Sequence, residues 1–205
     1  MKVAVVGGTG DFGANLAARL VDAGQDVVVG SRDGERAHAA ASEIGASGAT
    51  NAEAVGGVEL VVLAVKAEAA LGTASELAEA IAGTPVLSVA SALRFTKAGV
   101  FPGDDLRSLA ERTQELLKAP VVAGLHSLAA ATLAGGNADG DALVCGDDTG
   151  AKELALELAS LVVTGRALDA GPLASARALE GLTAVIVNLN KRYRAHAGLR
   201  VTGLA

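Results

Sequence analysis

Several residue types are scarce in this chain, and each scarcity excludes a class of structure. Cys145 is the only cysteine, so an internal disulfide is impossible and we expect a reducing compartment, the cytoplasm by default. Tryptophan is absent, and the aromatic residues are only Phe12, Phe95, Phe101 and Tyr193. A flat ligand would therefore lie mainly against aliphatic side chains and backbone.

Long apolar runs and an excess of basic charge are also missing. No uninterrupted apolar stretch approaches the roughly eighteen residues of a transmembrane helix, so we expect no membrane association. The apolar run 3–6 is too short for a signal peptide. With 17 Lys and Arg against 23 Asp and Glu, the net charge of −6 argues against nucleic-acid binding. Cations gather only near the C-terminus, at Lys191, Arg192, Arg194, His196 and Arg200.

The strongest motif lies at the N-terminus, in the segment KVAVVGGTGDFG. A short apolar run breaks into Gly8-x-Gly10-x-x-Gly13, after which apolar residues recur at helical spacing. In this arrangement the first glycine permits a sharp turn, the second lets a pyrophosphate approach the backbone, and the third lets the helix pack against the strand. Free N–H groups and the positive end of the helix dipole attract phosphates. The pattern predicts a dinucleotide site rather than a glycine turn without a ligand.

The end of the second predicted strand, 26–29, indicates which nicotinamide dinucleotide is bound. NAD-binding folds place Asp or Glu about twenty residues after the glycines, whereas this chain has Ser31 and Arg32. A hydroxyl and a guanidinium can hold a 2′-phosphate that a carboxylate would repel. Arg36, one helical turn further, supplies a second cation. These residues favour NADP(H), the alternative being two solvated arginines on a surface helix.

Strands and helices alternate along the rest of the chain. This alternation predicts an α/β fold, a Rossmann-type doubly wound and mostly parallel sheet with a small C-terminal helical region. We expect a dinucleotide-binding domain over residues 1–148 and a small α-rich domain, with the second ligand site and oligomer contacts, over 149–205. Segments 91–102 and 133–141 are expected to be loops. Further strands are predicted at 60–65, 85–89, 120–123 and 142–145, and helices at 35–44, 67–82, 106–117, 151–162 and 175–193.

Polar side chains follow several predicted strands, at the edge where open α/β sheets place their ligands. Lys66 follows strand 60–65 and is either a proton donor or a surface lysine. His126 follows strand 120–123 and is either an acid–base residue or a structural histidine. Asp147 and Asp148 have no third ligand at a suitable spacing. We therefore expect a helix cap there and no metal site.

The helix predicted over 175–193 carries apolar residues on two faces. A helix of this kind needs two partners. One partner is its own domain, and we expect the other to be a second subunit of a homodimer or higher homo-oligomer. The stripe consists of Leu179, Leu182, Ile186 and Leu189, with Val185 and Val187 beside it.

Longer segments resemble one family, the NADPH-dependent reductases of coenzyme F420, a 5-deazaflavin. The likeness begins with VVGGTGDFGANLAARL and continues with VVGSRDGERA. It extends to CGDDTGAKELALELAS and LDAGPLASARALEGLTAVIVNLN, which are more specific because general Rossmann proteins lack them. The chain departs from archaeal members at Lys66, Ala67 and Ala129, where they carry a proline, an aromatic residue and a proline.

The resemblance implies an oxidoreductase that transfers a hydride between NADP(H) and coenzyme F420. Both carry hydride chemistry of their own, so the protein positions them and no catalytic side chain is required, with His126 the one candidate. The NADP(H) contacts implied by the resemblance and by the glycine motif are Gly8, Thr9, Gly10, Asp11, Phe12, Gly13, Ser31, Arg32, Arg36, Ala67, Leu71, Leu93 and Ala130. The implied deazaflavin contacts are Thr9, His126, Leu128, Arg177 and Thr183.

Two other functions stay open on sequence alone. The first is an NADP-dependent reductase of a small carbonyl or imine substrate, with Lys66 or His126 as proton donor. The second is a non-enzymatic NADP-sensing module whose C-terminal helices bind a partner protein. Arg177 and the C-terminal cations suit the phosphate and glutamyl tail of coenzyme F420, although the cations also favour the helix dipole at that end.

Overall fold

The computed structural model describes residues 1–204, and its centre is an eight-stranded sheet in the order β10-β9-β8-β5-β4-β1-β2-β3. Two further strands form a separate antiparallel hairpin. The sheet strands are β1 Lys2–Val6, β2 Asp26–Ser31, β3 Ser47–Thr50, β4 Leu60–Leu63, β5 Val86–Ser88, β8 Val121–Gly124, β9 Ala142–Gly146 and β10 Ala167–Asp169, and the hairpin strands are β6 Leu93–Thr96 and β7 Gly99–Pro102.

Six neighbouring strands of the sheet, β3-β2-β1-β4-β5-β8, are parallel. Their order corresponds to the 3-2-1-4-5-6 order of dinucleotide-binding sheets. β9 pairs antiparallel with β8, and β10 pairs parallel with β9, so the last two strands run the other way. The predicted Rossmann-type α/β fold is confirmed. In such sheets the strand order reverses beside the first strand, here between β1 and β4, and ligands bind outside the carboxyl ends at that point.

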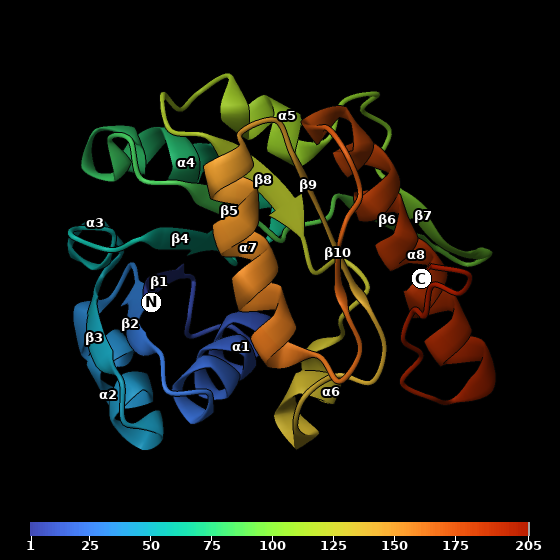
Figure 1. Ribbon diagram of the computed structural model, residues 1–205, viewed down its shortest axis with the longest axis horizontal. Helices are drawn as coiled ribbons and strands as arrows, with labels where there is room; N and C mark the ends of the chain where they lie inside the picture. The colour runs from blue at the N-terminus through green and yellow to red at the C-terminus, as the bar shows by residue number, and fades with distance from the viewer. Residues whose placement is uncertain (205) are drawn as a thin grey trace.

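Helices cover both faces of the sheet (Figure 1). The side chains of β1 alternate between the two faces, and because they are apolar on both, each face needs helices to bury it. Val3 and Val5 pack on one face with Leu16 of α1 (Asp11–Asp22) and with α7 (Thr149–Val162), which crosses the front of the sheet in Figure 1. Ala4 and Val6 pack on the other face with α4 (Ala67–Ile81) and α8 (Ala176–Tyr193). The helices are α1 Asp11–Asp22, α2 Gly34–Ile44, α3 Asn51–Ala54, α4 Ala67–Ile81, α5 Leu109–Gln114, α6 Ala130–Gly135, α7 Thr149–Val162 and α8 Ala176–Tyr193, with a 3₁₀ turn at Leu173–Ser175.

Some short elements differ from the sequence expectation. The segments expected to be loops contain the β6–β7 hairpin and the second half of α6, and the expected connection after α2 contains β3. β3 and β10 are short edge strands, with four and three residues and few large apolar side chains. α5 begins later than expected because Ser108, through a capping box with Glu111, starts the helix at Leu109.

The sheet continues beyond residue 148. β10 is its edge strand, and α7 packs against β8, β9 and β10. α8 and the β6–β7 hairpin lie together at the side of the sheet (Figure 1). The division into domains 1–148 and 149–205 stays a prediction, and residue 205 lies outside the described residues.

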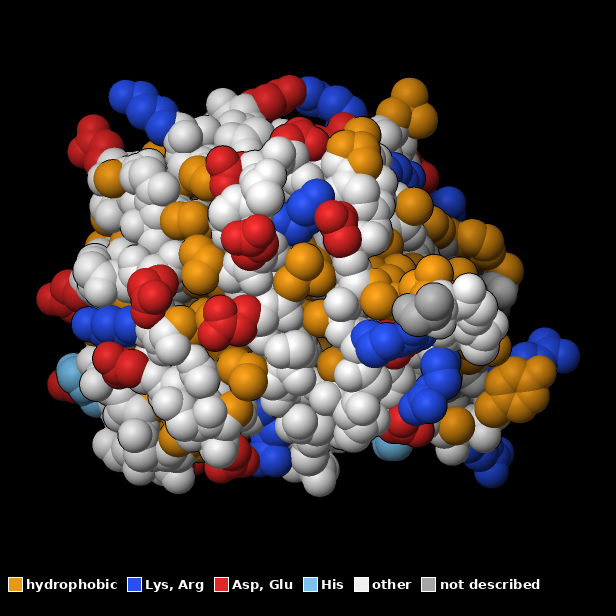
Figure 2. Space-filling view, viewed as in Figure 1, with side chains coloured by type: hydrophobic (Ala, Val, Ile, Leu, Met, Phe, Trp, Pro, Cys, Tyr) orange, Lys and Arg blue, Asp and Glu red, His pale blue; other side chains and the backbone are white. Residues whose placement is uncertain are grey.

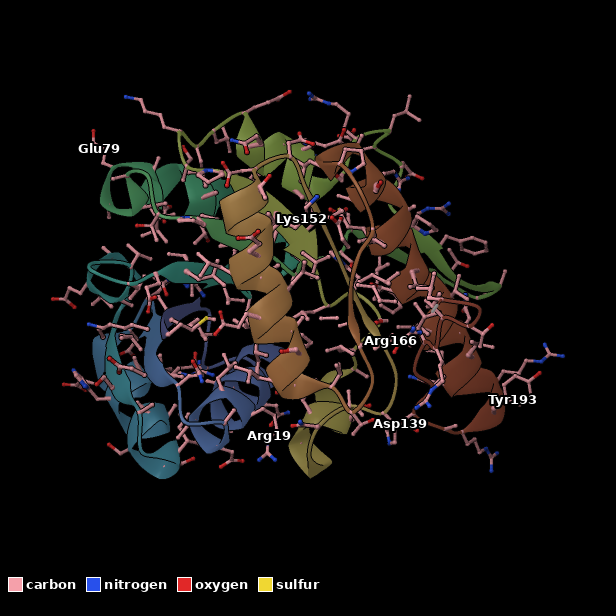
Figure 3. All side chains as sticks on the ribbon, viewed as in Figure 1. Arg19, Glu79, Asp139, Lys152, Arg166 and Tyr193 are labelled. Atoms are coloured by element: carbon pink, nitrogen blue, oxygen red, sulfur yellow. The ribbon has the colours of Figure 1, made fainter. Side chains whose placement is uncertain are left out.

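The C-terminal segment is held against the sheet by Asp141, whose carboxylate is almost fully buried. It accepts hydrogen bonds from the backbone N–H groups of Arg166 and Val201, both at 2.8 Å, and from the Arg166 guanidinium at 3.1 Å. Figure 3 shows Arg166 just before β10. These bonds, the backbone ones first, hold the pKa of Asp141 at about 2. Asp141 thereby holds the C-terminal segment 198–201 in place. The backbone oxygen of Asp141 also accepts a hydrogen bond from the hydroxyl of Ser127, which lies in the segment that follows β8.

Within residues 1–204, the helices are too short or too polar to cross a membrane.

Candidate functional site

The glycine loop that joins β1 to α1 leaves almost no space for side chains between its backbone and the neighbouring backbone atoms. A Cβ atom on Gly13 would lie 2.6 Å from the carbonyl oxygen of Gly7 and 2.9 Å from the Cα of Gly8. A Cβ atom on Gly8 would lie 2.8 Å from the carbonyl oxygen of Val5. Glycine is therefore required at both positions for the loop to pass this close to the strand, as the motif predicts.

The starts of three helices border one cavity, and none of the three has a side-chain cap. α1 begins after Gly10, α4 after Lys66 and α6 after Ala129, each without a capping hydrogen bond from a side chain. Elsewhere among residues 1–204, α2, α3, α5 and α7 are each capped by a side chain, from Asp33, Thr50, Ser108 and Asp148 respectively, whereas α8 continues from the 3₁₀ turn without such a cap. The bare N–H groups of α1 and α4 face the site with the positive ends of their dipoles. This arrangement suits an anionic ligand such as a pyrophosphate.

The cavity itself has a volume of about 370 Å³ and lies beside the switch point between β1 and β4. Most of its lining is aliphatic, as the scarcity of aromatic residues led us to expect. Nine of the predicted contacts line it: Gly10, Asp11, Phe12, Ala67, Leu93, His126, Leu128, Ala130 and Thr183. Residues not in that set also line it: Ala64, Val65, Lys66, Val89, Ala90, Ser91 and Leu125.

The predicted 2′-phosphate residues lie at the end of β2, beside the glycine loop. Ser31 and Arg32 line a second cavity of about 280 Å³. Arg36 extends from α2 and donates a hydrogen bond to the backbone oxygen of Thr9 at 3.4 Å, which brings its charge to the loop. Neither guanidinium forms an ion pair within residues 1–204. Both cations are therefore free to meet an anion.

Leu71 and Arg177 are two further predicted contacts that do not line the main cavity. Leu71 lines a neighbouring space of about 340 Å³, which shares Ala67 and Leu93 with the main cavity. Arg177 lies at the base of the β6–β7 hairpin, where it donates a hydrogen bond to the backbone oxygen of Gly103 at 2.9 Å. Arg177 can therefore reach only a part of the ligand that extends beyond the cavity.

His126 is buried in the cavity wall, two residues after the end of β8. Neither ring nitrogen has a hydrogen-bond partner of good geometry within residues 1–204. Burial lowers the pKa of His126 from the usual 6.5 to about 4, and the nearby backbone of Ala90 acts in the opposite direction. The imidazole is therefore neutral at pH 7, which makes it a poor proton donor.

We expect the His126 ring to stay neutral in solution. In a histidine NMR titration, its C2–H chemical shift should remain constant between pH 5.5 and 8, because the pKa is about 4. The spectrum of His126→Asn identifies the resonance. A midpoint near 6.5 for that resonance would contradict the burial of the ring.

α8 contributes Thr183 to the cavity lining and is attached to other elements by polar side chains that the sequence did not single out. Glu180, almost fully buried, accepts hydrogen bonds from the backbone N–H groups of Leu109 and Ala110 at 3.1 and 3.2 Å. Asn188 accepts from the N–H of Val100 at 2.9 Å and donates to its carbonyl oxygen at 2.7 Å. These bonds hold α8 against α5 and the hairpin, and so position Thr183 at the cavity.

The attachment through Glu180 should depend on pH. Burial raises the pKa of Glu180 from 4.5 to about 7, although the two backbone N–H groups favour the charged form. Between these values the folded protein keeps a proton that the unfolded chain has lost, so stability falls as pH rises. The free energy of unfolding of the wild type minus that of Glu180→Gln should fall by roughly 2 to 3 kcal/mol between pH 5 and pH 8. Urea denaturation measures both, and a difference independent of pH would refute the raised pKa.

The other predicted polar residues have structural roles. Asp148 caps α7 by accepting from the N–H of Ala151 at 2.8 Å, so the expected helix cap is confirmed. Asp147 accepts from the N–H of Leu173 at 2.9 Å. Within residues 1–204, acidic, histidine and cysteine side chains do not gather in groups of three or more that could hold a metal. Cys145 is buried in the core, and burial raises the pKa of its thiol to about 11.

Comparison with known proteins gives similarity over the whole chain. The family model "NADP oxidoreductase coenzyme F420-dependent" matches residues 2–92. The F420-dependent NADP reductase of Methanothermobacter marburgensis is 36% identical over 228 residues, which cover 100% of this chain and 99% of the relative. The F420-dependent NADP reductase of Methanocaldococcus jannaschii is 34% identical over 225 residues, with 100% and 99% coverage.

A solved structure extends this likeness to three dimensions. A protein from Arthrobacter sp. FB24, provisionally assigned as an F420-dependent NADP reductase, superposes with a TM-score of 0.83 and 28% identity, covering 100% of both chains. The curated relatives exceed 30% identity over the full length, so the likeness includes the C-terminal helices as well as the glycine loop. The chain belongs to the family of F420-dependent NADP reductases.

Proposed function

We propose that this protein transfers a hydride between NADP(H) and the 5-deazaflavin coenzyme F420. The observation that carries the proposal is the cavity beside the switch point, where uncapped helix starts meet an aliphatic lining. Such a site suits a molecule with a pyrophosphate at one end and a flat ring at the other. The activity named for the full-length relatives supports the same conclusion.

The residues fit NADP(H) along its length. The N–H groups at the start of α1 would hold the pyrophosphate, since no side chain caps them. The loop that presents them needs glycine at position 13, because a Cβ atom there would fill the space that the loop occupies. Ser31, Arg32 and Arg36 would hold the 2′-phosphate, since both guanidinium groups lack an acidic partner within residues 1–204. The remaining proposed NADP(H) contacts are Gly8, Thr9, Gly10, Asp11, Phe12, Ala67, Leu71, Leu93 and Ala130.

The deazaflavin would lie against the side of the cavity formed by the segment after β8 and by α8. His126, Leu128 and Thr183 line that side, and Thr9 lies on the adjoining loop. Its phosphate and glutamyl tail would extend toward Arg177 and the C-terminal cations. Of these cations, Arg200 is paired with Asp139 at 2.8 Å, and Lys191 lies over the ring of Phe95.

When both are bound, the nicotinamide and the deazaflavin supply the hydride chemistry themselves. The protein's own contribution is to position them and to exclude water. Leu93, Leu125 and Leu128 give the cavity an apolar wall, and the neutral ring of His126 adds no charge to it. With no acid–base group required, close and fixed placement of the two rings accounts for the rate.

A single assay separates this function from the alternatives. The purified protein is mixed with NADPH and oxidised coenzyme F420, and the visible absorbance of the deazaflavin is followed. Rapid loss of that absorbance supports the proposal. Persistent absorbance, with NADPH bound, would instead favour a carbonyl or imine reductase or a sensing module.

The compartment and the assembly state stay predictions. We propose the cytoplasm, since Cys145 is buried and unpaired. We also propose self-association through the outer face of α8, where apolar side chains gather on the surface beside the hairpin (Figure 2). The exposed apolar residues of this region are Phe95, Phe101, Val185, Leu189 and Tyr193, the last of which points away from the molecule in Figure 3. Sedimentation equilibrium measures the mass of the assembly.

A further inference from the structure

A chain of hydroxyl groups connects three elements at the cavity. Ser91 follows β5, Thr183 lies on α8, and His126 follows β8. The hydroxyl oxygens of Ser91 and Thr183 are 2.8 Å apart, and the Thr183 hydroxyl lies 2.9 Å from the backbone oxygen of His126. All three residues line the cavity.

The direction of these hydrogen bonds follows from the number of protons. A hydroxyl has one proton to donate and two lone pairs to accept with. The backbone oxygen of His126 can only accept, so the Thr183 proton is committed to it. The bond between Thr183 and Ser91 must then use the Ser91 proton. Ser91 Oγ is left with its lone pairs alone, and it therefore presents an acceptor to whatever fills the cavity.

We propose that Ser91 is a specificity-determining residue that accepts a hydrogen bond from an amide-type N–H group of the ring bound beside it. The proposal rests on the proposed function, because both reactants carry such a group. Nicotinamide has a carboxamide N–H, and the deazaflavin has an imide N–H. Because most of the surrounding lining is aliphatic, a ligand without this N–H leaves the Ser91 lone pairs unpaired.

The test uses ligand analogues that lack the N–H group. For the nucleotide, NADP⁺ is compared with its 3-acetylpyridine analogue, in which a methyl ketone replaces the carboxamide. For the deazaflavin, coenzyme F420 is compared with a derivative methylated at the imide nitrogen. Calorimetry gives the Kd of each ligand, and the ratio within each pair is formed separately for every variant. General weakening of the site then cancels from the ratio.

Three variants separate the effect of the Ser91 hydroxyl orientation from the effect of a smaller side chain. Ser91→Ala removes the acceptor. Thr183→Val keeps Ser91 but frees its proton, so the hydroxyl can turn and donate to a ligand that lacks the N–H group, and its preference for the N–H ligand falls. Ser88→Ala is the matched control, because Ser88 is buried three residues earlier and does not line the cavity.

We expect the wild type and Ser88→Ala to prefer the N–H ligand of one pair about tenfold, and the other two variants to lose most of that preference. If the preference is lost only for the nucleotide pair, the partner of Ser91 is the nicotinamide carboxamide. If it is lost only for the deazaflavin pair, the partner is the imide N–H of the deazaflavin. Unchanged ratios in Ser91→Ala overturn the proposal, as does a change in Ser91→Ala without one in Thr183→Val. The nucleotide pair requires no deazaflavin binding, so failure of the proposed function is seen separately.

Discussion

Arg32→Ala should lower the preference for NADPH over NADH by roughly 10- to 100-fold, the value of a charge-assisted contact to one phosphate. Arg32 lies at the end of β2 without an ion-pair partner within residues 1–204, so its charge is available to the 2′-phosphate. NADH lacks that phosphate and should be used almost as well by the variant as by the wild type. The measurement is kcat/KM for each nucleotide with coenzyme F420 as acceptor.

Arg107→Ala is the matched control for this variant. Arg107 is half exposed and paired with Glu115, so removing it should leave the preference unchanged. If Arg32→Ala reduced kcat/KM for NADPH and NADH equally, the assignment of Arg32 to the 2′-phosphate would be wrong.

Gly13→Ala should weaken NADP⁺ binding by more than about 100-fold, because the bare N–H groups of α1 contact the phosphates only while the loop keeps its shape. The added Cβ would meet the carbonyl oxygen of Gly7 and the Cα of Gly8, both backbone atoms that cannot turn away. The loop must therefore move. Calorimetry with NADP⁺ measures the loss.

Gly72→Ala is the control for adding a methyl group elsewhere. Gly72 lies inside α4, and nothing lies within 4 Å of the position its Cβ would take. This variant should bind NADP⁺ as the wild type does, and its stability should rise by up to about 1 kcal/mol in urea denaturation. A Gly13→Ala variant that bound NADP⁺ with wild-type affinity would show that the loop does not hold the phosphates.

Elements with local sequence signals could be predicted, and elements that depend on distant partners could not. β1, the glycine loop and α1 follow one another within 22 residues, so their pattern is visible in a short window. β3 has only four residues, and it is a strand because β2 supplies its hydrogen bonds. The β6–β7 hairpin is stabilised by Asn188, 88 residues from Val100.

The same distinction applies to the site. Glycines 8, 10 and 13 and the pair Ser31 and Arg32 are recognisable because their chemistry depends on spacing in the sequence. Glu180 reads as an ordinary charged residue of α8, yet it is buried and binds N–H groups about 70 residues away. Ser91 gains its orientation only when α8 brings Thr183 to it. The sequence could not provide either contact.

In the proposed reaction, one cavity holds the nicotinamide and the deazaflavin so closely that the hydride passes directly between them. Single turnover with NADPH that carries deuterium at the transferred position of its nicotinamide C4 tests this claim, with mass spectrometry of the reduced deazaflavin as the readout. We predict that the deuterium is found at the reduced ring carbon of the deazaflavin. Deuterium released to water, or no reduction of the deazaflavin, would contradict direct hydride transfer in this cavity.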